Sequence, residues 1–217
     1  MIAVCRYLLR ELFSSARHLA GVVLYLAIMV VWYANPMGSL LPAFSLPALM
    51  MSVLAAWLTW VIASLPGPNQ WAMSAAAVGG QRKMVAGVAL GAATLCVPVA
   101  VVSCLAGMWA YRDLTPRDVV LGLIAHLACA AQGIALTLFT GRGIWCTTTS
   151  AVLLTLIAQV AVFAVPVSAS RLVVTTFVGG YLPSQTDIVR LVGAFGVFVL
   201  LSVVATALQA RVRSGHP

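Results

Sequence analysis

The stretch 66–83, PGPNQWAMSAAAVGGQRK, carries the start and stop signals of a short helix and lies between two long apolar segments. The PGP run at 66–68 should end the preceding helix, and Asn69 is a suitable N-cap because its side-chain oxygen can accept a hydrogen bond from a free backbone N–H. The glycine pair at 79–80 favours a C-terminal stop. The sequence therefore predicts a helix from Gln70 to Val78.

Composition places this helix at a membrane surface. Of the 217 residues, 63% are hydrophobic and only 7% are charged, and the mean hydropathy is +1.08. A soluble globule would leave too much apolar surface exposed, so we expect an all-α integral membrane protein with a single transmembrane domain over residues 1–217. A helix spanning 70–78 is about 14 Å long, whereas the hydrocarbon core of a bilayer is about 30 Å thick. The helix should therefore lie on the surface.

Apolar runs predict six membrane spans, at about residues 18–34, 47–65, 84–109, 119–140, 148–167 and 188–209. Residues 2–17 carry leucines on one stripe and arginines on another, which predicts an amphipathic helix lying flat on the membrane. The alternative is an extension of the first span into the cytoplasm. Residues 168–186, SASRLVVTTFVGGYLPSQT, are too apolar for a solvated loop and too short for a span, so we expect a re-entrant segment before the sixth span.

The distribution of basic residues predicts that both termini are cytoplasmic. Six spans put eight basic residues on the side of the termini, namely Arg6, Arg10, Arg17, Arg82, Lys83, Arg142, Arg211 and Arg213. The other side receives four, namely Arg112, Arg117, Arg171 and Arg190. Because cytoplasmic loops are enriched in Lys and Arg, the helix at 70–78 should face the cytoplasm, and the expected location is the cell (plasma) membrane. Topology thus explains the net charge of +8, and nucleic acid is not expected as a partner.

Three polar side chains lie inside expected spans: His126 and Gln132 in the fourth, and Gln159 in the fifth. A polar group in hydrocarbon usually faces the bundle interior and can mark a substrate pathway, but it can also form an interhelical hydrogen bond. Both interpretations stay open for these residues. His126 and Gln132 do not share a face, because six positions turn a helix by about 240°.

Small residues recur at four-residue spacing in two expected spans. Gly87 and Gly91 form GxxxG in the third, and Ala125, Cys129 and Gly133 form a ladder in the fourth. Such patterns allow helices to approach closely. The five cysteines show no CxxC spacing, and most lie in or beside apolar spans, so we expect structural thiols.

The sequence lacks the patterns of side chains that most enzymatic mechanisms require. The four carboxylates are not paired within any span, and the motifs GxxxxGK[ST], HExxH and GxSxG are absent. We therefore expect no catalytic residue, no metal site and no ATPase activity of the chain itself. An intramembrane enzyme using His126 is the least favoured alternative.

The stretch 75–95, AAAVGGQRKMVAGVALGAATL, is similar to a segment of the membrane subunit of ATP-binding-cassette transporters of type 2, in which a short coupling helix leads through a basic pair into the third span. The expected layout, with its flat basic helix, six spans and re-entrant segment, also resembles this family. The resemblance implies pairing of two membrane subunits, identical or different. It also implies a separate ATPase subunit that binds ATP and Mg²⁺, so that this chain needs no cofactor of its own.

Carried onto this chain, the resemblance implies docking of the ATPase on the helix at 70–78. The matching positions are Gln70, Trp71, Met73 and Ser74, with Arg82 and Lys83 at the membrane edge. Trp71 and Met73 are the expected apolar anchors, because large buried side chains dominate interfaces. Anchoring in lipid headgroups is the alternative role for Trp71.

The expected function is ATP-driven export of a lipophilic or amphipathic substrate, because a nearly uncharged interior suits such a cargo. The main alternative is a six-span substrate-binding subunit of a vitamin-type uptake system. That alternative predicts tight binding of a small molecule by the isolated chain.

Overall fold

The computed structural model describes residues 2–34, 40–111, 115–141, 148–166, 168–178 and 184–214. Within these ranges the chain is helical and contains no strand. The helices are α1 (Ile2–Ser15), α2 (His18–Ala34), α3 (Leu40–Ala43), α4 (Ser45–Ser64), α5 (Pro68–Ala77), α6 (Gln81–Ala110), α7 (Pro116–Thr140), α8 (Thr148–Val162), α9 (Ala169–Val178) and α10 (Gln185–Ser214). The all-α membrane class expected from composition is confirmed.

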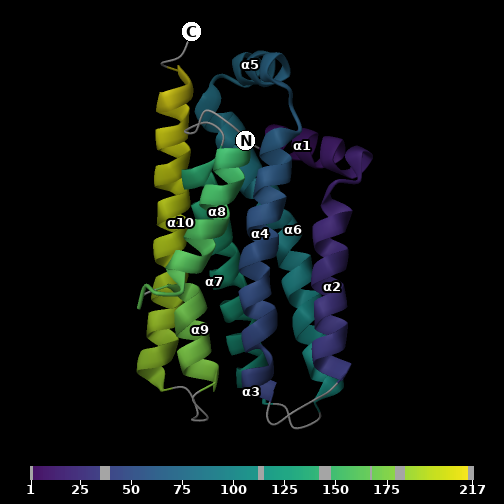
Figure 1. Ribbon diagram of the computed structural model, residues 1–217, viewed down its shortest axis with the longest axis vertical. Helices are drawn as coiled ribbons and strands as arrows, with labels where there is room; N and C mark the ends of the chain where they lie inside the picture. Colours follow the sequence, from purple (N-terminus) through teal and green to yellow (C-terminus); the bar gives the residue numbers. More distant parts are fainter. Residues whose placement is uncertain are drawn as a thin grey trace.

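The long helices form an elongated bundle with α4 and α7 at its centre (Figure 1). In the most apolar 18 residues of Leu41–Ser64 and of Pro116–Thr140, 61% and 67% are buried, against 22% in those of Gln185–Arg211. The outer helices thus present most of their apolar surface outward, as expected where lipid replaces water as the solvent.

Four helical segments in the described residues are long and apolar enough to cross a membrane: Leu41–Ser64, Gln81–Ala110, Pro116–Thr140 and Gln185–Arg211. They correspond to the second, third, fourth and sixth expected spans. A fifth is added if α1 and α2 count as one bent span, although the chain turns by 78° between them. The six-span count stays a prediction.

The amphipathic helix expected at the N-terminus is α1, which lies across one end of the bundle (Figure 1). Val4, Leu8 and Leu12 are buried, and the arginines of the polar stripe are exposed. The buried stripe contacts α6, where Val4 lies against Gly87. The sharp turn into α2 occurs at Ala16, which has a φ of 53°.

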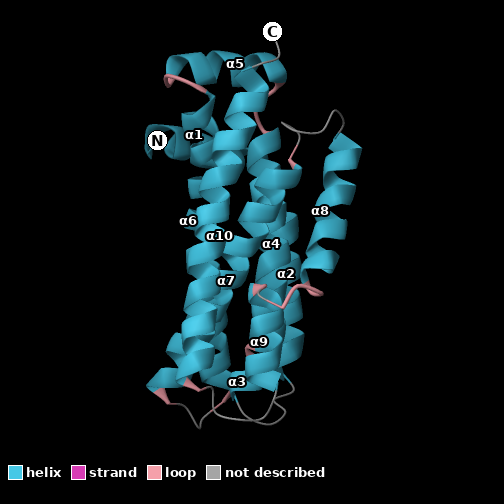
Figure 2. Cartoon of the chain, turned by 90° about the vertical axis from the view of Figure 1, so that its left-hand side faces the viewer, coloured by secondary structure: helices cyan, strands magenta, loops and turns pink. Residues whose placement is uncertain are grey.

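The fifth expected span and the expected re-entrant segment correspond to two short helices, and their placement in the membrane stays a prediction. The helix α8 ends at Val162, and α9 begins at Ala169, closer to the α3 end of the bundle (Figures 1 and 2). Pro166 lies in the break. Because proline has no N–H to continue the helical hydrogen bonds, α8 and α9 do not form one continuous helix. Ala169, Val173 and Phe177 bury one face of α9. Residues 179–183 of the expected segment lie outside the described residues.

Both termini, α1 and α5 lie at the same end of the bundle (Figure 1). Arg112 and Arg142, which belong to the two groups of basic residues used to orient the chain, fall outside the described residues. The cytoplasmic orientation of this end therefore stays a prediction.

The small-residue patterns mark close helix contacts. A Cβ added to Gly133 would lie 2.1 Å from the carbonyl oxygen of Ser52, so α7 touches the backbone of α4 at this point. A Cβ added to Gly122 would lie 2.5 Å from the ring of Phe44. Glycine at these positions lets the central helices approach as expected for small residues in membrane bundles.

Candidate functional site

The helix α5 lies roughly perpendicular to the long helices and covers one end of the bundle (Figures 1 and 2). It begins at Pro68 with Gly67 as its N-cap, so the expected start at Gln70 with Asn69 as cap is wrong. The reason is that proline is well suited to the first helical position, because its fixed φ is already helical and its missing N–H needs no partner.

The expected stop at the glycine pair is confirmed. Gly79 and Gly80 have φ values of 82° and 123°, which side chains with a Cβ rarely adopt. The N–H of Gly80 donates to the carbonyl of Ala75 at 2.7 Å, and the N–H of Gly79 donates to that of Ala76 at 3.2 Å. This pair of hydrogen bonds is the Schellman motif, and it turns the chain from α5 directly into α6.

Trp71 attaches α5 to the bundle. Its side chain is 7% exposed, and Ala75, one turn further on, is 3% exposed. The indole N–H donates a hydrogen bond to the side-chain oxygen of Gln81 at 2.6 Å. Trp71 also borders a small cavity of about 30 Å³ whose other lining residues come mainly from α4, α6, α7 and α10. The indole therefore seats α5 where these long helices meet.

The other residues expected to bind a partner lie on the outside of the same end. Met73 is 73% exposed, and Gln70 is also exposed. The side-chain oxygen of Gln70 accepts a long hydrogen bond of 3.4 Å from the N–H of Gly67. Ser74 is half-buried. Of the two expected anchors, Met73 is exposed, whereas Trp71 is buried and hydrogen-bonded to Gln81.

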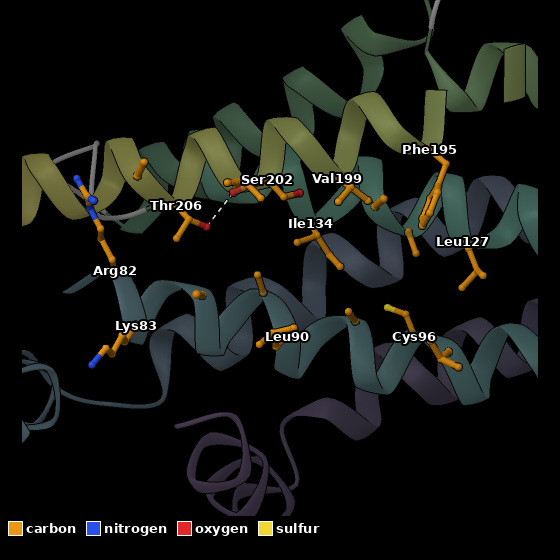
Figure 3. Close-up of a pocket in the computed structure, with 18 residues that line it drawn as sticks. Arg82, Lys83, Leu90, Cys96, Leu127, Ile134, Phe195, Val199, Ser202 and Thr206 are labelled. Carbon is orange, nitrogen blue, oxygen red and sulfur yellow. Dashed lines mark hydrogen bonds between the residues drawn. The ribbon is translucent and has the colours of Figure 1, made fainter. Parts of the chain in front are cut away.

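Arg82 and Lys83 are exposed and lie at the α5 end of a large groove (Figure 3). The groove has a volume of about 640 Å³ and is bounded by α6, α7 and α10. Leu90 and Ala93 of α6, Ile134 of α7 and Val199 of α10 are among its lining residues. The basic pair thus lies between the surface around α5 and the apolar part of the groove.

His126 is fully buried and joins α7 to α6. Its Nδ1 lies 2.7 Å from the carbonyl oxygen of Gly122, so this nitrogen carries the proton. Its Nε2 lies 2.8 Å from Oγ of Ser103 and accepts the hydroxyl proton. This is the tautomer that a serine-activating histidine would need. However, neither side chain lines the large groove or the small cavity beside Trp71.

Gln132 and Gln159 form two further contacts between helices. The amide nitrogen of Gln132 donates to Oγ of Ser170, and its oxygen accepts from the N–H of Ser170 at 3.2 Å, which joins α7 to α9. Gln159 accepts from the hydroxyl of Ser52 at 2.9 Å and donates to its carbonyl at 3.3 Å, which joins α8 to α4.

The three polar residues considered for a substrate pathway are therefore not brought together. Each has at least one polar atom hydrogen-bonded to a neighbouring helix, and none of them lines the large groove. Their geometry fits interhelical hydrogen bonds, which was the second interpretation of these residues from the sequence.

Several functional features were missed by reasoning from the sequence. The serine partners Ser52, Ser103 and Ser170 are ordinary residues of apolar helices, and no local pattern distinguishes them. Gln209 of α10 is buried, and its amide donates to the carbonyl of Leu138. The large groove could have been suspected only from the alanines of the third and fourth expected spans, which are common throughout the chain.

The cysteines fit the expected role of structural thiols. Cys96, Cys104 and Cys129 are free and buried, and Cys5 is free and partly buried. Cys146 lies outside the described residues. Within the part of the chain that the structure describes, no cluster of three or more His, Cys, Asp or Glu side chains could hold a metal ion.

Comparison with protein-family models, with curated proteins and with solved structures gives no match for this chain.

Proposed function

We propose that this chain is the membrane subunit of an ATP-binding-cassette transporter of type 2, and that a separate ATPase subunit docks on α5. The observation that carries the proposal is the position of α5, a short helix with an exposed Met73 that lies across the end of the bundle carrying both termini. This helix of ten residues is attached to α6 by the buried Trp71 and its hydrogen bond to Gln81, so it can pass on a force applied to it.

The proposed topology has six crossings with both termini in the cytoplasm. In this topology α2 is the first crossing, and α8 and α9 together form one broken fifth crossing. The 17 residues of α2 are enough for a span, since about 17–25 residues cross the hydrocarbon core. A break in the fifth crossing is tolerable because the N–H groups of residues 163–165 donate to the carbonyls three residues earlier, and one face of α9 packs against α4 and α10.

The proposed mechanism is a mechanical coupling between two chains. Binding of ATP and Mg²⁺ by the partner ATPase would move α5, and the Trp71–Gln81 hydrogen bond would transmit this movement to α6. Coupling of this kind requires each state of the partner to favour a different arrangement of the bundle. Two membrane subunits would then rock against each other to open a path between them.

The proposed cargo is a lipophilic or amphipathic molecule, and the proposed direction is export. The support is the scarcity of charge inside the bundle: the buried polar and charged side chains of the described residues are His, Ser, Thr and Gln, and none is Asp, Glu, Lys or Arg. A charged cargo would require charged or strongly polar residues along its path.

The direct test is affinity purification of the tagged full chain from native membranes in a mild detergent. We expect a nucleotide-binding subunit to co-purify, and the complex to hydrolyse ATP. The Met73→Asp variant should recover less of that subunit while inserting normally. Recovery of the chain without any ATPase, in every mild detergent tried, would refute the proposal.

A further inference from the structure

We propose that the groove between α6, α7 and α10 binds one anionic phospholipid of the bilayer, with its headgroup at Arg82 and Lys83. The two basic side chains lie at the α5 end of the groove, and the remainder of its wall extends along the bundle (Figure 3). No acidic side chain is among the residues that line the groove. Arg82 points toward α10, whereas Lys83 points away from it and its Nζ lies beside Gly79 (Figure 3). A negative headgroup at Arg82 would therefore meet one positive charge directly, a second on the next residue and no negative one.

The wall of the groove has the chemistry of an acyl-chain site. Apart from the basic pair, its lining consists of apolar residues together with Ser202 and Thr206. The hydroxyl of Ser202 donates to the carbonyl of Phe198 at 2.9 Å, and that of Thr206 donates to the carbonyl of Ser202 at 2.8 Å. Because these hydroxyl protons already form hydrogen bonds within α10, the occupant of the groove needs no hydrogen-bond acceptor at Ser202 or Thr206.

The dimensions of the groove fit the same occupant. Along α6 the lining extends from Arg82 to Val97, which corresponds to about 22 Å at 1.5 Å per residue. One leaflet contributes half of a hydrocarbon core of about 30 Å, so an acyl chain that starts at Arg82 can lie entirely inside the groove. The volume of about 640 Å³ lies within the range of sites that enclose a small molecule.

Charge favours a lipid over a helix from a second copy of this chain. The chain has four acidic residues, Glu11, Asp113, Asp118 and Asp187. Asp118 and Asp187 lie in the first turns of α7 and α10, at the end of the bundle opposite α5 (Figure 1), and Asp113 lies outside the described residues. Of the acidic residues that the structure describes, a second copy in the same orientation could offer only Glu11 to the basic pair, whereas an acidic leaflet offers many headgroups.

The binding test uses the purified full chain without any partner. The chain is titrated with phosphatidylglycerol and with phosphatidylcholine of identical acyl chains, and bound lipids are counted by native mass spectrometry. We expect one phosphatidylglycerol to bind more tightly than phosphatidylcholine. The Arg82→Gln and Lys83→Gln variants should each weaken phosphatidylglycerol binding about five-fold and leave phosphatidylcholine unaffected, since one basic residue near a membrane surface contributes about that much.

Two matched controls separate this groove from general attraction to lipid. Arg10→Gln removes an exposed charge from α1 at the same end of the bundle and should leave the preference intact. Ala93→Trp fills the groove and should abolish tight binding, whereas Leu105→Trp, at an exposed position of α6 that does not line it, should not. Should Ala93→Trp fail to fold, phosphatidylglycerol with a photoreactive group in its acyl chain maps the site in the unmodified protein, with cross-links expected on α6 and α10.

Three results would overturn the inference: equal affinity for the two lipids, an effect of Arg10→Gln as large as that of Arg82→Gln, or cross-links outside the groove. Loss of a dimer rather than of bound lipid in Ala93→Trp would instead assign the groove to a second copy. The inference goes beyond the proposed transport function, because the test needs no ATPase. Failure to recover an ATPase would thus refute the transporter without affecting the lipid site.

Discussion

The indole N–H of Trp71 donates a hydrogen bond of 2.6 Å to the side-chain oxygen of Gln81, and this contact joins the middle of α5 to the first residue of α6. The two helices are separated only by a turn that the glycine pair closes with backbone hydrogen bonds. The contact therefore limits how far α5 can move without moving α6.

Truncating Trp71 should loosen α5. Trp71→Ala removes a buried aromatic side chain and should cost up to about 3–5 kcal/mol of unfolding free energy, as is usual for buried aromatic residues. Trp71→Phe keeps a smaller aromatic ring and loses the hydrogen bond, and should cost less than Trp71→Ala because the half-buried Gln81 can turn to water, which limits the loss of the hydrogen bond to about 1 kcal/mol. Denaturation in detergent measures both, and hydrogen exchange of the α5 amides shows whether the loss is local. Equal costs for the two variants would show that packing of the ring is unimportant.

Met73 should be needed for partner docking and unimportant for folding. Because Met73 is 73% exposed, Met73→Asp should leave the unfolding free energy within about 0.5 kcal/mol of the unsubstituted protein. In the proposed complex it should reduce ATPase binding at least tenfold, as expected for a central apolar contact worth more than about 1.4 kcal/mol. Met73→Leu is the matched control and should bind normally. Full binding by Met73→Asp would place the docking surface elsewhere.

Gly133 and Gly196 provide a comparison of glycine sites on two helices. Gly133→Ala would bring a methyl group within 2.1 Å of the Ser52 carbonyl oxygen, so α7 and α4 must separate. We expect a loss of about 3 kcal/mol, the upper part of the usual range for overpacked cores. Gly196→Ala on α10 meets no atom within 4 Å and should be neutral or slightly stabilising. Thermal unfolding of both variants in the same detergent tests the contact.

The Ser103–His126 pair should contribute to stability without supporting catalysis. A double-mutant cycle of Ser103→Ala and His126→Leu should give a coupling energy of about 0.6–1.7 kcal/mol, as measured for polar pairs in membrane bundles. Neither side chain should react with a fluorophosphonate probe, because both are fully buried. Labelling that disappears in Ser103→Ala would instead support an intramembrane enzyme.

Gln159 should hold α8 against the bundle. The outward face of α8 carries Leu153, Ile157 and Val160, each more than half exposed, so the Gln159–Ser52 pair is a principal link to α4. Gln159→Leu should cost about 0.6–1.7 kcal/mol and increase hydrogen exchange in α8. Exchange in α6 should not change, which provides the internal control. Unaltered exchange in α8 would mean that its other contacts, among them the Thr140–Thr155 hydrogen bond to α7, position this helix.

The features that could be predicted from the sequence depend on local signals. Hydropathy identified the membrane class and four spans that the structure describes as long apolar helices. The stop of α5 followed from a glycine pair, whose positive φ values are a property of those two residues. The start of α5 was misplaced by two residues because Gly67 and Pro68, rather than Asn69, form its N-terminus.

The candidate site was only partly predictable. The exposed positions of Met73, Arg82 and Lys83 agree with a surface that is open to a partner or to lipid. The inward position of Trp71 could not be foreseen, because the same amphipathic ring suits a protein interface, a headgroup layer and the end of a bundle. Which of these the indole meets depends on how α4, α6 and α7 are arranged beneath it.

The sequence by itself determined that this chain is helical and embedded in a membrane, and that a short helix interrupts its long spans. These properties follow from transfer free energies and backbone preferences that act within a few turns of the chain. The tertiary structure decided that His126, Gln132 and Gln159 join helices, and that a groove opens between α6 and α10. Such contacts join residues that are far apart in sequence, as with Ser52 and Gln159, so only the packing of whole helices brings them together.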